Sequence, residues 1–137
     1  YVTGFITEQS AIHNPETLES TYGYWSWEDR GAQTFAVNPQ TKMPEAMTIV
    51  ASYRSQGKQG EAGYIPSSGR QGGKIFREEW ARARLIGVKT ALVISWNEYV
   101  LGEQVDAETS KDLEPNTVYG EEYYELLKEE IKKFKHK

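Results

Sequence analysis

The stretch of sequence that decides the fold is TALVISWNEYVLGE, residues 90–103. It opens with a short apolar run rich in β-branched side chains, which is typical of a strand buried on both faces in a parallel sheet. The run ends in Trp96, Asn97 and Glu98. Enzymes with parallel strands place their chemistry at the carboxyl ends of those strands, where buried polar groups need partners. We therefore expect these three residues to form the floor of a site.

The segments on either side of this strand alternate between strand patterns and helix patterns. Strand candidates are apolar or aromatic in their bodies and polar at their carboxyl ends, whereas helix candidates carry apolar side chains three or four positions apart. Gly87 is placed to end the helix that precedes the central strand. We expect strands over residues 1–7, 21–30, 45–53 and from residue 90, and helices over residues 14–18, 75–86 and 119–135.

This alternation predicts an α/β protein built from parallel βα repeats. Four such strands cannot close a barrel, because about eight are needed. We therefore expect residues 1–137 to be one segment, the carboxyl-terminal part, of about four βα units, of a (β/α)8 TIM barrel. An upstream segment or another chain would then complete the barrel and cover the free sheet edge. The alternative is a complete, smaller α/β domain with both sheet edges covered by its own helices.

Composition excludes several classes of function. The chain has 137 residues, of which 38% are hydrophobic and 12% aromatic, so it can build a core. A net charge of −4 argues against nucleic acid as a partner. No apolar run approaches the roughly 18 residues that a membrane span needs. The absence of cysteine leaves the compartment open, and a secreted or cell-surface bacterial location is compatible with it.

A second concentration of aromatic residues lies upstream, in the predicted strand of residues 21–30. Strand alternation places Trp25 and Trp27 on one face, and Tyr24 and Glu28 on the other. Packing of the two indoles in the core is the plain structural alternative. Because parallel strands end at one rim, we expect the Glu28 end of this strand to face the same opening as residue 98.

Two carboxylates beside aromatic walls suit glycoside hydrolysis. That reaction needs a carboxyl pair about 5 Å apart for retention of configuration, or about 6.5–9.5 Å apart for inversion. An apolar wall raises the pKa of the carboxyl that acts as the acid. Glu28 and Glu98 are the candidate catalytic pair. Aromatic faces can stack on sugars, and an amide can hydrogen-bond hydroxyls, so the candidate substrate-binding residues are Trp96, Asn97, Tyr99, Trp25, Trp27 and Tyr24.

Two further segments have compositions that occur in cofactor or metal sites. Residues 54–74 contain six glycines and suit a binding loop, but Ile75 stands where a phosphate-binding loop needs Ser or Thr. Residues 98–125 contain nine acidic residues against one lysine. Such a run is usually a solvated face, and a calcium site is the alternative, although the spacing does not match an EF-hand. We therefore expect no cofactor and no metal.

Four short runs occur in the same order in a group of bacterial barrels. They are GKIFREEW at residues 73–80, SWNEY at 95–99, DLEP at 112–115 and YGEEYY at 119–124. In these runs the chain resembles glycoside hydrolases related to the endo-α-mannosidase family (glycoside hydrolase family 99) and the WbsX-like family. Members commonly carry a second Trp where this chain has Tyr99.

The resemblance implies a TIM barrel that hydrolyses a polysaccharide or glycan. In the endo-mannosidase branch the catalytic carboxylates lie upstream of the Trp-Asn-Glu strand, so the resemblance implies that Trp96, Asn97 and Glu98 form a sugar-binding floor. Three functions thus remain open from the sequence. They are a glycoside hydrolase or its carboxyl-terminal part, a non-catalytic carbohydrate-binding barrel domain, and a metal-assisted lyase, which the presence of only two histidines disfavours.

Overall fold

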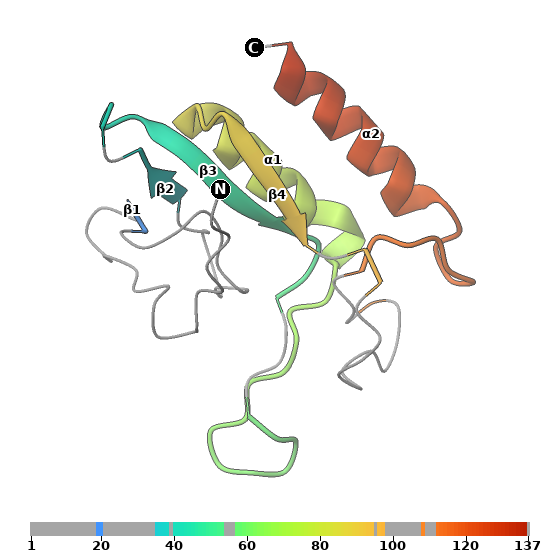
Figure 1. The fold of residues 1–137 in the computed structure, drawn as a ribbon. Coiled ribbons are helices and arrows are strands. Elements are labelled where there is room, and N and C mark those ends of the chain that lie inside the picture. The colour runs from blue at the N-terminus through green and yellow to red at the C-terminus, as the bar shows by residue number, and fades with distance from the viewer. Residues whose placement is uncertain are drawn as a thin grey trace.

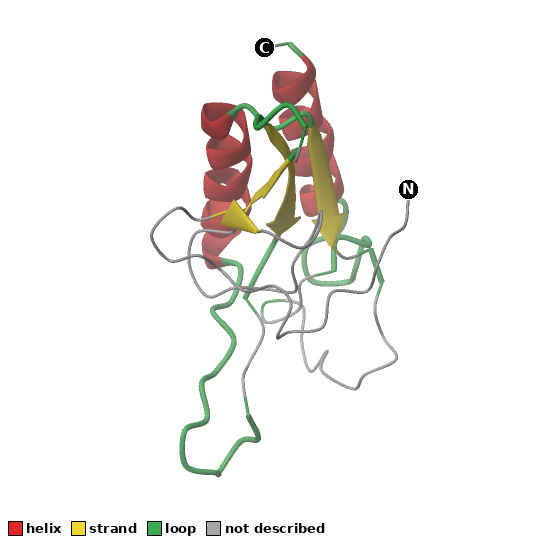
Figure 2. Ribbon diagram, turned by 60° about the vertical axis from the view of Figure 1, so that its left-hand side comes forward, coloured by secondary structure: helices red, strands yellow, loops and turns green. Residues whose placement is uncertain are grey.

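The fold is a small mixed sheet with two helices packed on one of its faces (Figures 1 and 2). A computed structural model describes residues 19–20, 35–38, 40–53, 57–94, 96–97, 108 and 112–136. Its elements are β1 (Glu19–Ser20), β2 (Phe35–Val37), β3 (Pro44–Val50), the short 3-10 turn η1 (Gln71–Gly73), α1 (Lys74–Ile86), β4 (Thr90–Ile94) and α2 (Glu122–Lys135).

The strands lie in the order β1-β2-β3-β4. β1 is only two residues long and pairs with β2 in parallel, β2 pairs with β3 antiparallel, and β3 pairs with β4 in parallel. The β3–β4 register runs from Ala46 opposite Thr90 to Val50 opposite Ile94. Residues 46–50 of β3 are buried, whereas residues 91–94 of β4 are partly exposed. β3 is therefore the centre of the described sheet, and β4 lies at its edge.

The prediction of about four βα units of a (β/α)8 TIM barrel is wrong for the described structure. A barrel of that kind needs parallel neighbours, but β2 and β3 are antiparallel. The physical reason is the length of their connection. Residues 38 and 40–43 lie in the short connection from β2 to β3, where the Asn38 side chain accepts backbone N–H groups of Gln40 and Thr41, both at 2.9 Å. A parallel connection needs a dozen or more residues, so this short connection allows only an antiparallel pair.

Three of the elements predicted from residue 45 onward are confirmed individually. The predicted strand of residues 45–53 corresponds to β3, and the predicted helices of residues 75–86 and 119–135 correspond to α1 and α2. Gly87 ends α1 in the left-handed conformation, with φ of 82° and its N–H on the Ala83 carbonyl. The elements expected over residues 1–7, 14–18 and 21–30 lie outside the described residues.

The core lies between the sheet and the two helices. Trp80 of α1 is 2% exposed and meets Phe76 and Phe134 edge to face, with ring centroids 6.2 and 5.5 Å apart. Arg84 of α1 and Glu130 of α2 form an ion pair at 2.5 Å. Helical spacing brings one apolar stripe of α1 onto β3 and one apolar stripe of α2 into the same core cluster. The buried core cluster consists of Met47, Ile49, Ala51, Phe76, Trp80, Ala83, Val88, Leu113, Tyr123 and Leu126.

Because β3 and β4 are parallel, their carboxyl ends lie at the same end of the sheet (Figure 1). Residues 57–70 extend away from the sheet at this end before the chain enters α1 (Figures 1 and 2). We call the end of the sheet at which β3 and β4 finish the strand-end rim. It consists of residues 51–53, 67–71, 96–97, 108 and 112–124. In the described part of the chain, neither helix is long and apolar enough to cross a membrane.

Candidate functional site

Two of the eight residues predicted for the site lie within the described structure. Trp96 and Asn97 follow the end of β4 at Ile94, at the strand-end rim, and both are exposed. Their predicted place at the carboxyl end of a strand is therefore confirmed. The remaining predicted residues lie outside the described residues, and so does the separation of the two carboxyls proposed for catalysis. These residues are Glu98, Glu28, Tyr99, Trp25, Trp27 and Tyr24.

Trp96 forms an exposed aromatic pair with Tyr124 in the first turn of α2. The ring centroids lie 5.8 Å apart with an interplanar angle of 78°, an edge-to-face contact. Trp96 is 45% exposed and Tyr124 is 39% exposed. Lys128 lies over the Tyr124 ring at 5.2 Å and is held there by hydrogen bonds to Glu125 at 2.7 and 2.9 Å. We call Trp96 and Tyr124 the rim pair.

The backbone of Trp96 is held by the segment of residues 112–114. The backbone N–H of Glu114 donates to the Trp96 carbonyl at 3.0 Å. Asp112 and Leu113, just before it, are buried, and Leu113 is part of the core cluster. Trp96 is therefore anchored through its backbone to a buried segment, while its side chain stays in contact with solvent.

Arg70 is the buried cation at the centre of the rim. It is 1% exposed, and its guanidinium donates through Nη2 to the backbone carbonyl of Asp112. The same group lies over the Tyr123 ring at 4.1 Å and the Tyr119 ring at 5.3 Å, which are cation–π distances. Burial lowers the pKa of Arg70, and Tyr123, Tyr119 and Asp112 are among the neighbours that oppose this shift. A guanidinium keeps its charge at physiological pH, so the rim holds a buried positive charge.

Glu108 lies beside Arg70 and accepts three hydrogen bonds through its carboxylate. Its Oε1 atom accepts the backbone N–H groups of Arg70 and Gln71 at 2.8 and 3.0 Å, and its Oε2 atom accepts the Tyr119 hydroxyl. The bond from Tyr119 is the largest cause that lowers the pKa of Glu108, and it raises the pKa of Tyr119 to about 12. Gly69 has a φ of +66°, which strains other residues, and a Cβ atom there would lie 2.7 Å from Glu108 Oε1 and would displace that carboxylate.

A cluster of hydroxyl groups lies where β3 ends. Ser52 Oγ lies 3.0 Å from Ser67 Oγ and 3.2 Å from Ser68 Oγ. The Tyr53 hydroxyl donates to the buried carboxylate of Glu79 on α1 at 2.9 Å. Burial and the Glu79 carboxylate raise the pKa of Tyr53. These contacts fix both ends of the long connection between β3 and α1 to the sheet.

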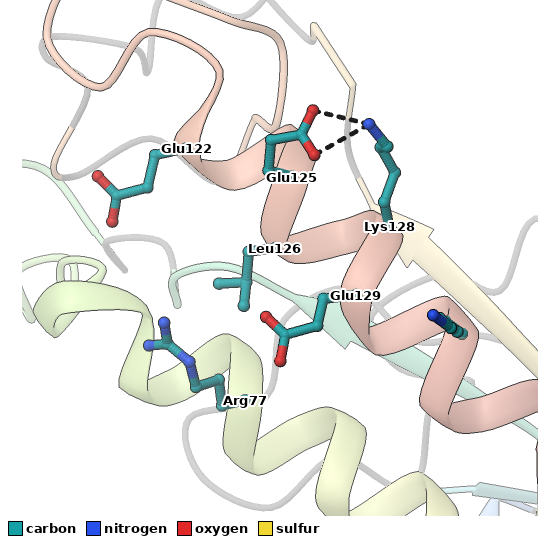
Figure 3. Close-up of a pocket in the computed structure, with 7 residues that line it drawn as sticks. Arg77, Glu122, Glu125, Leu126, Lys128 and Glu129 are labelled. Carbon is teal, nitrogen blue, oxygen red and sulfur yellow. Dashed lines mark hydrogen bonds and ion pairs between the residues drawn. The ribbon is translucent and has the colours of Figure 1, made fainter.

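A surface hollow of about 550 Å³ lies along residues 122–132 of α2, beside Arg77 of α1 (Figure 3). Figure 3 shows the Glu125 carboxylate paired with Lys128, and the Arg77 guanidinium on the side of α1. Three acidic and three basic side chains balance their charges around a single apolar one, so the hollow is not a focused acid–base site. Its lining residues are Arg77, Glu122, Glu125, Leu126, Lys128, Glu129 and Lys132. Among the described residues there is also no group of three or more His, Asp or Glu side chains that could hold a metal ion.

Sequence reasoning did not identify four of the rim residues, namely Arg70, Glu108, Tyr119 and Tyr124, as members of a site. Arg70 lies in the glycine-rich loop and bonds across 42 positions of sequence to Asp112, a distance that periodicity does not report. The run YGEEYY offered one usable signal. Two of its tyrosines cannot lie on the same helical stripe, because Tyr123 and Tyr124 are adjacent, so one of them had to face outward.

Comparisons with protein family models, with curated proteins and with solved structures found no match for this chain. The resemblance to the endo-α-mannosidase and WbsX-like families therefore stays a prediction from the residues that carry it.

Proposed function

We propose that this chain binds carbohydrate on the rim pair and acts as a glycoside hydrolase, or as part of one. The observation that carries the proposal is an exposed indole, beyond the carboxyl end of the edge strand β4, beside an exposed phenol on α2. Large aromatic side chains usually gain stability from burial, so two of them in contact on the surface suit a binding surface.

The rim pair has the chemistry that a sugar ring needs. Saccharides present flat faces of C–H groups, which pack on aromatic surfaces, and hydroxyl groups at their edges. Asn97 is exposed next to Trp96 and its amide can both donate and accept hydrogen bonds to such hydroxyls. A few polar groups placed beside an apolar surface are what small-molecule sites typically contain.

The hydrolytic part of the proposal rests on Glu98, which follows Asn97 in the sequence. A carboxyl next to an indole wall can have its pKa raised and act as a general acid. The second carboxyl is Glu28 in this proposal, and the pair must flank one glycosidic bond. Because β2 and β3 are antiparallel, a barrel fold does not support this proposal. The proposal depends on the rim pair and on these two carboxylates.

Carbohydrate binding without hydrolysis is the second candidate function. It is favoured by the way the described rim uses its carboxylates. Glu108 accepts two backbone N–H groups and the Tyr119 hydroxyl, and Asp112 is buried. A carboxylate that holds backbone groups together is not placed to transfer protons to a substrate.

Binding is tested by titrating neutral oligosaccharides into the full chain and following them by calorimetry. Trp96→Ala should weaken binding by up to about tenfold, because an aromatic contact is worth up to about 1.5 kcal/mol and about 1.4 kcal/mol is a factor of ten. Leu85→Ala is the control, since Leu85 is an exposed apolar residue on α1, 89% exposed, and is not part of the rim. Equal affinities in wild type and Trp96→Ala would remove the rim pair from the proposal.

Hydrolysis is tested separately by release of new reducing ends from the same oligosaccharides. Glu98→Gln keeps the size of the side chain but cannot exchange a proton in the same way, so it should abolish release while binding persists. Wild-type protein that binds but releases nothing would support the non-catalytic function. Wild-type protein that neither binds nor hydrolyses any member of the panel would overturn both.

A further inference from the structure

We infer that Arg70 is a positioning residue for the rim pair, joining the segment that holds Trp96 to the turn that begins the helix carrying Tyr124. The part of this inference that concerns saccharide affinity rests on the proposed function. The part that concerns the geometry of the two rings does not, because it depends only on contacts within the chain.

The first half of the connection runs from Arg70 to Trp96. The guanidinium donates to the carbonyl of Asp112, two residues before Glu114. The N–H of Glu114 then donates to the Trp96 carbonyl at 3.0 Å. Since Arg70 bonds the start of this three-residue segment and Trp96 bonds its end, a shift of the segment moves the indole with it.

The second half of the connection runs from Arg70 to Tyr124. The guanidinium lies over the Tyr123 ring at 4.1 Å, and Tyr123 packs against Tyr119 with ring centroids 5.2 Å apart. Tyr123 directly precedes Tyr124 in the first turn of α2. The contact of one buried cation with Tyr119 and Tyr123 therefore fixes the start of the helix on which the second ring of the pair stands.

Arginine is the side chain suited to this position. Its planar guanidinium can stack on an aromatic ring while its N–H groups donate in the plane, and it is more weakly hydrated than the lysine ammonium. Its backbone N–H is also used, donating to Glu108 at 2.8 Å. Lysine would supply the charge but could not cover a ring and direct a planar donor at once.

The rim pair needs such a connection because the core does not hold its rings. Both rings are more than a third exposed, and neither belongs to the core cluster. Their 5.8 Å contact joins the chain after β4 to the first turn of α2, which are separated by more than 20 positions of sequence. The Arg70 side chain contacts both segments, through Asp112 on one side and through Tyr119 and Tyr123 on the other.

The test compares Arg70→Met and Arg70→Lys with the matched control Arg77→Met. Arg77 is exposed on α1 and donates to the Gly72 carbonyl. The tryptophan indole N–H signals of ¹⁵N-labelled full chain are recorded, and Trp96→Phe assigns the Trp96 signal. In Arg70→Met we expect this signal to shift or broaden while the signal of buried Trp80 stays in place. Arg70→Lys should give an intermediate change, and Arg77→Met none.

Saccharide titration supplies the second measurement. Arg70→Met should raise the dissociation constant by up to about tenfold, as Trp96→Ala does, whereas Arg77→Met should leave it unchanged. A folded Arg70→Met protein with an unmoved Trp96 signal overturns the inference. If Arg70→Met does not fold, Tyr123→Leu carries the same test, because it removes the ring under the guanidinium and keeps an apolar core residue. Wild-type protein that binds no saccharide counts against the proposed function only, since the indole signals still test the positioning.

Discussion

The helix-covered face of the sheet and the strand-end rim are stabilised by different kinds of contact. On the helix face, apolar side chains of β3, α1 and α2 form one core cluster, in which Trp80 of α1 contacts Phe134 of α2. At the rim, the Glu108 carboxylate accepts backbone N–H groups of residues 70–71, and the buried Arg70 guanidinium donates to the backbone carbonyl of Asp112. Apolar packing gains free energy in proportion to buried area, whereas polar connections add little net stability but fix geometry. The difference indicates that the core sets stability and the rim sets the shape of the candidate site.

The largest expected effect is on the core. Trp80→Ala should lower the free energy of unfolding by about 3–5 kcal/mol, because it removes a fully buried indole and leaves a cavity. Urea denaturation followed by circular dichroism measures this change. Trp96→Ala is the paired variant at the rim and should change stability by no more than about 0.5 kcal/mol, since the side chain is exposed. Equal losses in the two variants would contradict the division between core and rim.

The next effect concerns the one strong polar contact described between the two helices. Arg84→Met leaves Glu130 buried with Lys133 at 2.8 Å and no arginine, and should lower the free energy of unfolding by about 2–3 kcal/mol. Burial alone would raise the pKa of Glu130, but hydrogen bonds from Lys133 and Arg84 lower it overall. Denaturant unfolding measures the loss.

A double variant separates a buried-charge penalty from a loss of packing. Arg84→Met combined with Glu130→Met removes both charges and keeps apolar volume, so it should be more stable than Arg84→Met alone. Arg77→Met, on the exposed side of α1, is the control for the loss of one positive charge. A double variant that is less stable than the single one would show that Glu130 still stabilises the protein without Arg84, through its remaining contact with Lys133 at 2.8 Å.

The helix face could be predicted from the sequence because its contacts follow local periodicity. Phe76, Trp80 and Ala83 recur at helical spacing, and Gly87 marks where α1 ends. The fold prediction was wrong because of the three-residue strand β2. β2 is too short to show a pattern, and the Asn38 turn after it decides the antiparallel pairing that rules out the expected barrel units.

The rim was predicted only where it touches a strand. Trp96 and Asn97 follow an apolar run, so their place at the end of β4 could be inferred from the sequence. Arg70 and Glu108 lie 38 positions apart in loops without periodicity, and their contact depends on how the whole chain folds. Long-range polar contacts of this kind have no signature in a single sequence, which is why Arg70 and Glu108 were recognised as members of the site only from the structure.

The smallest expected effect is at Glu108 and depends on pH. The pKa of Glu108 is lowered from its ordinary value of 4.5 in the folded chain, chiefly by the bond from Tyr119. A lowered folded-state pKa contributes stability above the unfolded pKa, and that contribution is lost as the pH falls through the folded pKa. Glu108→Gln should therefore lower stability at neutral pH by no more than about 1 kcal/mol, because an exposed carboxylate is screened by solvent. Unfolding curves of both proteins at several pH values measure the difference.

Two outcomes distinguish this contribution from a general effect of charge. The difference in stability between wild type and Glu108→Gln should shrink as the pH falls below about 4.5, where the unfolded wild-type chain takes up the proton, and should be lost below the lowered folded-state pKa, where the carboxylate is neutral in both states. The phenolate absorbance of Tyr119 should titrate near its raised pKa of about 12 in wild type and closer to 10 in the variant. Glu61→Gln, in the exposed part of the long loop, is the control and should alter neither measurement. A difference that stays constant down to low pH would mean that Glu108 stabilises the rim by the packing of its side chain and not by its charge.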